Sequence, residues 1–85
     1  GLRGALSART LHALRTYVTS IATASEEGIA RAMRMTWERM KIIIEPSSAV
    51  PLACLLERTL DVAGKRVGII LTGGNVDLDT LPWQR

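Results

Sequence analysis

The sequence predicts an α/β fold, in which helices cross between the strands of a partial parallel sheet. Apolar residues recur at helical spacing in three segments, and two short β-compatible segments alternate with them. The later of these two is a near-continuous apolar run, which is typical of a parallel strand covered on both faces. The 85 residues allow one small domain or a piece of a larger one.

Two helices are expected in the first half of the chain. The first spans Ser7 to Val18, with apolar residues at Leu11 and Leu14. The second begins at Ser25, because a serine hydroxyl can cap free backbone N–H groups, and the two glutamates that follow favour the positive end of a helix dipole. Its apolar stripe is typical of a core and consists of Ile29, Met33, Trp37 and Met40.

A third helix is expected after Glu45, because the proline that follows pushes this residue away from helical geometry. Ser47 and Ser48 are predicted to cap the helix, which runs to about Leu60. Pro51 then falls in the first turn, where backbone donors are unpaired in any case.

The predicted strands are Ser20–Ala24 and, after a turn at Gly64, Arg66–Leu71. Joined through helices, two such strands form a right-handed crossover unit. Two or three strands cannot close a doubly wound sheet, and the second run is too apolar for an exposed edge. We therefore expect residues 1–85 to be the C-terminal part of a large domain whose N-terminal remainder is missing. The turn-like opening of the chain, Gly1–Gly4, also indicates a fragment.

The composition excludes several classes of protein. A single cysteine, Cys54, and a single histidine, His12, exclude an internal disulfide framework and a multi-histidine metal centre. No apolar run approaches the roughly 20 residues of a membrane span. The net charge is only +3, the arginines are spread along the chain, and the few aromatic residues, one tyrosine and two tryptophans, lie far apart in sequence. A solvated basic surface is therefore favoured over a nucleic-acid interface.

Polar residues follow the apolar strand directly, in the turn Thr72-Gly73-Gly74-Asn75. Ligands of open α/β sheets bind beyond the carboxyl ends of the strands. The glycines allow the backbone to approach a ligand closely, and the Thr72 hydroxyl can both donate and accept a hydrogen bond. Glu45 is a second polar residue that could meet a ligand. From the residues alone, two simpler interpretations stay open: the turn binds no ligand, and Glu45 only caps the next helix.

Three segments carry a more specific pattern: Ser25–Glu27, the stretch from Trp37 to Val50, and Gly64–Leu78. In this order and spacing they resemble the C-terminal part of the serine racemase and serine/threonine dehydratase family, which are pyridoxal-phosphate enzymes of fold type II. The resemblance covers essentially the whole chain. It implies that the fold is a fragment of a fold type II enzyme.

The resemblance also implies a function. The full-length protein is expected to use pyridoxal 5'-phosphate and to convert L-serine or L-threonine to a 2-oxo acid and ammonia, or to racemise serine. In the family, the hydroxyl that matches Thr72 hydrogen-bonds the pyridine nitrogen of the cofactor. Gly73 and Glu45 are expected beside the cofactor, and Lys41 and Asn75 match positions that meet a nucleotide effector in racemase members. A cytoplasmic homo-oligomer with an amino acid as substrate, and with no nucleic acid or membrane as partner, is implied as well.

The family's Schiff-base lysine, glycine-rich phosphate loop and divalent-cation carboxylates have no counterpart in residues 1–85 and are expected upstream. No catalytic or metal-binding residue is therefore assigned in this chain, which is expected to be inactive alone. The alternative is a non-catalytic remnant that acts as a small interaction module.

Overall fold

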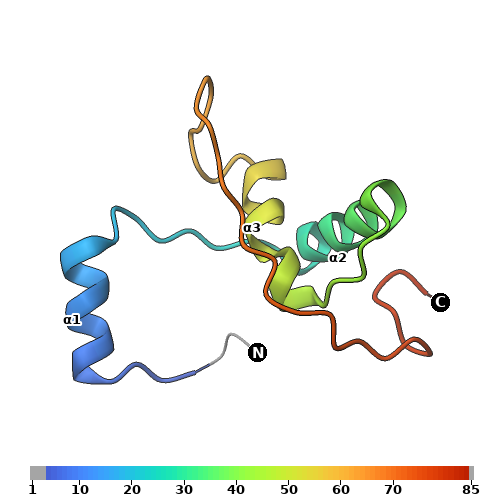
Figure 1. Ribbon diagram of the computed structural model, residues 1–85, viewed down its shortest axis with the longest axis horizontal. Helices are drawn as coiled ribbons and strands as arrows, with labels where there is room; N and C mark the ends of the chain where they lie inside the picture. Colours follow the sequence, from blue (N-terminus) through green and yellow to red (C-terminus); the bar gives the residue numbers. More distant parts are fainter. Residues whose placement is uncertain (1–3, 85) are drawn as a thin grey trace.

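The computed structural model describes residues 4–84, which form three α-helices and one π-helical turn (Figure 1). The helices are α1 (Ala8–Tyr17), α2 (Glu26–Met35) and α3 (Pro46–Leu56), and the π-helical turn η1 (Thr36–Met40) continues α2 directly. Helix α1 stands apart from the α2–α3 pair. The first three residues of the expected opening turn lie outside the described part of the chain.

The first two helices begin at the expected places, Ser7 and Ser25, and the serine caps the helix in both cases. The Ser7 hydroxyl accepts a hydrogen bond from the Thr10 backbone N–H at 3.1 Å, and the Ser25 hydroxyl accepts one from the Gly28 N–H at 3.0 Å. Both serines have extended backbone geometry and occupy the N-cap positions. These two predictions are confirmed, although α1 buries none of its residues.

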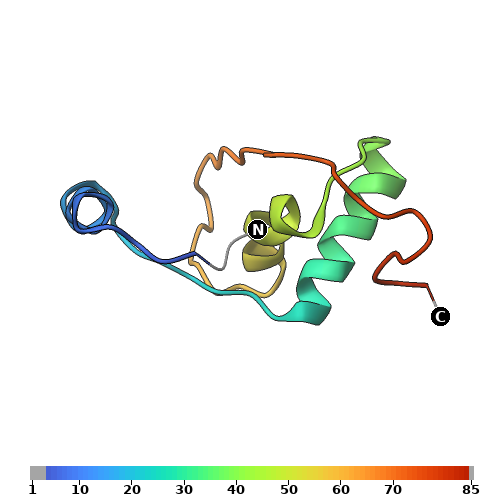
Figure 2. The ribbon, with the colours of Figure 1, turned by 90° about the horizontal axis from the view of Figure 1, so that it is seen from below.

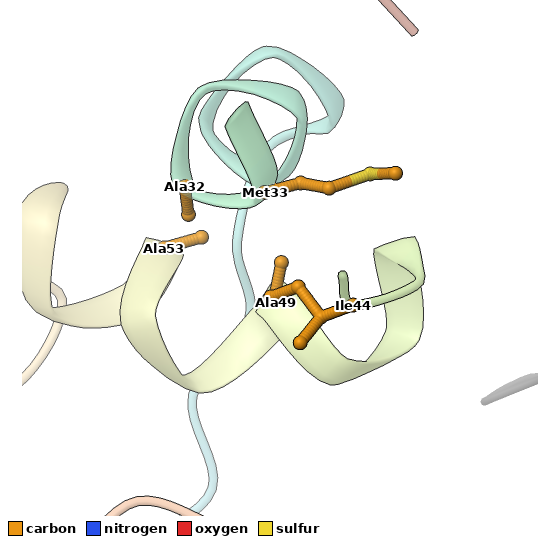
Figure 3. Close-up of a cluster of buried hydrophobic side chains, with 5 residues drawn as sticks. All are labelled: Ala32, Met33, Ile44, Ala49 and Ala53. Carbon is orange, nitrogen blue, oxygen red and sulfur yellow. The ribbon is translucent and has the colours of Figure 1, made fainter. Parts of the chain in front are cut away.

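The core lies between α2 and α3. Figure 3 shows its five buried apolar residues, which are Ala32, Met33, Ile44, Ala49 and Ala53. Three of them are alanines, so the two helices can approach closely. Met33 belongs to the predicted stripe, whereas Met40 of the same stripe is 58% exposed. The wider π-helical turn between them changes the helical spacing and carries Met40 away from the core.

Helix α3 differs from its predicted bounds at both ends. It begins at Pro46, so Ser47 and Ser48 lie inside its first turn and do not cap it, and Pro51 lies in the helix interior. The helix stops before the expected Leu60, because Arg58 adopts a left-handed conformation with φ 56°. The N–H groups of residues 58 and 59 then bond to the carbonyls of residues 55 and 54, which closes the end in a Schellman motif.

The predicted parallel sheet and its crossover unit are not shown by this structure, because no strand occurs within residues 4–84. The two expected strands, Ser20–Ala24 and Arg66–Leu71, are extended segments that run separately past α3 (Figure 2), and Ala22 and Val67 line one pocket with residues of that helix. A strand is completed by hydrogen bonds to a neighbouring strand, and within residues 4–84 no backbone hydrogen bond joins these two segments. Much of the second run is consequently exposed, with Ile70 at 79%.

The C-terminal segment returns to α2. Trp83 contacts Trp37 in a T-shaped arrangement, with ring centroids 5.2 Å apart, and the Arg34 guanidinium carbon lies 5.9 Å from the centre of the Trp83 ring. Val76 and Leu81 pack against the edge of the core. The residues that follow the Thr72 turn are therefore anchored to the helix pair.

The chain is less tightly folded than an isolated domain of its length. Its radius of gyration is 14.3 Å, compared with about 12 Å expected for a compact domain of 85 residues. Within residues 4–84, no helix has both the length and the apolar character that crossing a membrane requires.

Candidate cofactor site at the start of helix α3

The two polar points predicted from the sequence meet at the start of α3. The Glu45 backbone N–H donates a hydrogen bond to the Gly73 carbonyl at 3.0 Å. One residue earlier, the Thr72 N–H donates to the Ser48 hydroxyl, also at 3.0 Å. Residues 72–73 are thus held along the first turn of α3, although more than twenty residues separate the two segments.

The backbone on the helix side of this junction is firmly placed. Glu45 precedes a proline and adopts the extended geometry expected of such a residue, with φ −83° and ψ 165°. The preceding Ile44 is buried, and its carbonyl accepts a hydrogen bond from the Trp37 indole N–H at 2.9 Å. The position of Glu45 is therefore determined by the core.

The two glycines at the junction allow the segments to touch. A Cβ atom on Gly73 would contact the Glu45 carboxylate, and one on Gly74 would lie 2.5 Å from the Ile43 carbonyl oxygen. Side chains at these positions would push the turn away from α3. The glycine pair predicted a close approach to a ligand here, and the structure shows a close approach between two parts of the chain.

The polar side chains of the junction are free to meet a ligand. Thr72 is exposed and Glu45 is half-buried. Within residues 4–84, neither the Thr72 hydroxyl nor the Glu45 carboxylate makes a side-chain hydrogen bond or an ion pair. The junction therefore presents a neutral hydroxyl and a carboxylate from neighbouring positions.

The two predicted effector residues lie in different surroundings. Asn75 lines a pocket of about 150 Å³ together with Met33, Pro46 and Asp77, next to the junction. Lys41 follows the π-helical turn in a left-handed conformation with φ 59° and is exposed. It is not among the residues that line this pocket. Within the described residues, no group of three or more metal-binding side chains is clustered.

Two serine hydroxyls make hydrogen bonds that the sequence did not predict. Ser48 was expected to cap α3 but instead accepts the Thr72 N–H. Ser25 caps α2 as expected, and in addition its N–H and hydroxyl donate to the two carboxylate oxygens of Glu57 at 2.8 and 2.6 Å. The serine side-chain bond, followed by the backbone bond, lowers the pKa of Glu57 below its ordinary value of 4.5. Both partners lie more than twenty residues away in sequence, so no local pattern could have found them.

Comparison with known proteins identifies the family. Residues 1–73 match the family model described as pyridoxal-phosphate dependent enzyme. The chain belongs to this family. The cofactor of this family is pyridoxal phosphate. The predicted relation of the chain to serine racemases and dehydratases of fold type II is confirmed.

Individual relatives cover nearly the whole chain. It is 52% identical over 83 residues to the β-hydroxyaspartate dehydratase of Paracoccus denitrificans (strain Pd 1222), which covers 98% of this chain and 26% of that protein. It is 37% identical over 86 residues to the serine racemase of Bos taurus, with the same coverage of both proteins. It is 39% identical over 74 residues to an L-threo-3-hydroxyaspartate ammonia-lyase of Pseudomonas sp, covering 87% of this chain and 23% of that enzyme.

The chain thus spans about a quarter of the length of the curated relatives it matches. No solved structure gives a significant match.

The junction residues fit one edge of the family's cofactor. A pyridine nitrogen needs a single hydrogen-bond partner, and a threonine hydroxyl serves it by donating to the neutral form or accepting from the protonated form. Thr72 offers such a hydroxyl on an exposed residue whose backbone is held by α3. Glu45 adds a half-buried carboxylate beside it.

Proposed function

We propose that residues 1–85 form one wall of the active site of a pyridoxal-phosphate-dependent ammonia-lyase or racemase that acts on β-hydroxy amino acids. The observation that supports this most directly is the meeting of Thr72-Gly73 with Glu45 at the start of α3, where both polar side chains lack partners within residues 4–84. The family match and the names of the relatives supply the class of reaction.

Each residue has a distinct role in the proposal. The Thr72 hydroxyl bonds the pyridine nitrogen, the absence of a side chain at Gly73 lets the ring lie close, and Glu45 places a carboxylate near the ring. When bound, the cofactor withdraws electrons from the α-carbon of the amino acid. A neutral hydroxyl at the ring nitrogen tempers this withdrawal, since it stabilises a protonated ring less than a carboxylate would.

The substrate class divides into two candidates. The resemblance of the sequence to serine racemases and serine/threonine dehydratases implies L-serine or L-threonine. The relative with 52% identity is named a β-hydroxyaspartate dehydratase, and another relative is named an L-threo-3-hydroxyaspartate ammonia-lyase, which favours a substrate with a second carboxylate. We propose 3-hydroxyaspartate as the first substrate to test, with serine and threonine as its competitors. Elimination from any of the three yields a 2-oxo acid and ammonia.

The proposal also gives the extended segment Arg66–Leu71 a place in the full-length protein. Arg66–Leu71, which is extended and largely exposed, joins a parallel sheet whose other strands come from elsewhere in the full-length protein. The loose packing of residues 4–84 supports this arrangement. Residues 1–85 are then the C-terminal part of the large domain of a cytoplasmic homo-oligomer. Asn75 and Lys41 are its proposed nucleotide contacts, and the pocket beside Asn75 supports the first of these.

The test is an assay of the purified full-length protein. Ammonia release, 2-oxo acid formation and change of chirality are measured with L-threo-3-hydroxyaspartate, L-serine and L-threonine, together with cofactor content from the visible absorption. We expect stoichiometric cofactor and the highest kcat/KM for hydroxyaspartate. Higher kcat/KM for serine or threonine would return the substrate to the sequence-based expectation. A protein that binds no pyridoxal phosphate would overturn the proposed function.

A further inference from the structure

We propose that Ser48 is a positioning residue, whose hydroxyl holds the Thr72 backbone so that the Thr72 side chain meets the cofactor's ring nitrogen. This inference rests on the proposed function of Thr72. It concerns a serine to which neither the family resemblance nor the sequence pattern gave such a role.

The burial of Ser48 is the first argument. Its exposed fraction is 1%, and Ala49 and Ala53 of the same helix are fully buried at the interface with α2. An alanine would suit such surroundings, whereas a buried hydroxyl is costly without a hydrogen-bond partner. Ser48 has one partner of this kind, the Thr72 N–H, at 3.0 Å. The hydroxyl is therefore tied to the turn.

Helix capping does not account for Ser48. The N-cap of α3 is Glu45, which makes no side-chain capping bond, and Ser48 is the third residue of the helix. Its own N–H donates to the Glu45 carbonyl at 3.0 Å. Ser47, beside it, makes no side-chain hydrogen bond within residues 4–84 and is half-buried. Two adjacent serines in one helical turn thus differ in the bond to Thr72, and Ser48 is also the more buried of the two.

The position of the bond along the chain is the second argument. The Thr72 N–H is held by Ser48, and the Gly73 carbonyl is held by the Glu45 N–H. One of these bonds lies before the φ and ψ bonds of Thr72 and the other lies after them. Together they therefore orient the Cα–Cβ bond of Thr72 relative to α3. Within the described chain, residues 66–76 make no other hydrogen bond through their backbone to the helices. Loss of one bond leaves Thr72 attached on its carboxyl side alone, next to two flexible glycines.

The decisive experiment compares Ser48→Ala with Ser47→Ala in the full-length protein. For Ser48→Ala we expect cofactor affinity to fall about tenfold, which corresponds to one lost hydrogen bond, and the Thr72 amide to exchange with solvent faster by a similar factor. The melting temperature should change little, since alanine is a good helix former among neighbouring alanines. Ser47→Ala should leave affinity, exchange and melting temperature as in the unmodified protein.

A double-mutant cycle separates positioning from packing. If Ser48 acts through the Thr72 hydroxyl, Ser48→Ala should cost little further cofactor affinity when Thr72 is already alanine. Additive losses would overturn the positioning role, as would unchanged affinity in Ser48→Ala. If the unmodified protein binds no cofactor, the proposed function fails and the positioning role with it. Faster Thr72 exchange in Ser48→Ala would then still identify the bond as structural, so the two failures are distinguishable.

Discussion

At opposite ends of α3, two glutamates each lie against a glycine, and their carboxylates are used differently. Glu57, at the C-terminal end, lies where a Cβ on Gly28 would be, and both its oxygens accept hydrogen bonds from Ser25. Glu45, at the N-terminal end, lies against Gly73, and its oxygens accept none within residues 4–84.

Helix dipoles explain part of this difference. A carboxylate is unfavourable at the C-terminal end of a helix, where the partial charge is negative. Glu57 is placed there with respect to α3, but its carboxylate also lies at the N-terminus of α2, where the charge is positive and Ser25 donates. Its hydrogen bonds to Ser25 join the end of α3 to the start of α2. Glu45 lies at the favourable end of α3 without a donor, so its oxygens stay available to a ligand.

The largest expected effect is at Gly74, the neighbour of Gly73 at the Glu45 end of α3, and it is compared with Gly28 at the Glu57 end. Gly74→Ala places a Cβ on the Ile43 carbonyl, a backbone atom that cannot move aside, and should destabilise the full-length protein by about 1–3 kcal/mol. Gly28→Ala is the matched control. Its Cβ meets only the end of the Glu57 side chain, and the gain in helix propensity of about 1 kcal/mol offsets the lost bonds. Denaturant unfolding measures both variants, and equal losses would contradict the distinction.

A second prediction concerns Thr72. Thr72→Ala should weaken cofactor binding by about 1–3 kcal/mol, because it leaves the ring nitrogen without a partner. Thr72→Ser keeps the oxygen and should bind nearly as well as the unmodified protein. The unfolding free energy should not change in either variant, since Thr72 is exposed and its bond to Ser48 uses the backbone. Cofactor titration followed by visible absorption provides the measurement. Unchanged affinity in Thr72→Ala would reduce Thr72 to a turn residue.

The smallest effect is the pH dependence contributed by Glu57. Because its pKa is lowered in the folded state, the unfolded chain binds more protons at acid pH, and stability rises with pH. The contribution is present above 4.5, the ordinary value, and is lost as the pH falls through the lowered folded value. Unfolding curves of the unmodified protein and of Glu57→Gln should therefore converge below pH 4.5. A constant difference between the two across that range would show that the Ser25 bonds do not stabilise the charged carboxylate.

Local signals in the sequence predicted the helices well. Ser7 and Ser25 mark true N-caps, since a cap depends only on the residues of one turn. The ends of α3 were missed for a physical reason: Pro46 itself begins the helix, and an arginine adopts the left-handed geometry usually supplied by glycine. The two segments predicted as strands are unpaired within residues 4–84, because pairing depends on distant neighbours, which hydrophobic pattern alone does not provide.

The site was predicted in its parts but not in its assembly. Thr72, Gly73 and Glu45 were singled out, and the structure brings all three together. Nothing in the sequence indicated that the Glu45 backbone would hold Gly73 or that Ser48 would hold Thr72. Such contacts follow from how the extended segment passes over α3, which is set by the tertiary structure.

The contact between Trp37 and Trp83 gives this chain an internal optical signal. The two rings are its only tryptophans, it contains no phenylalanine and one tyrosine, and the rings meet edge to face at 5.2 Å. Its near-ultraviolet absorption therefore comes almost entirely from one place, where the residues after the Thr72 turn reach α2. Circular dichroism in that range reports whether the C-terminal segment is in contact with the helix pair, without any label.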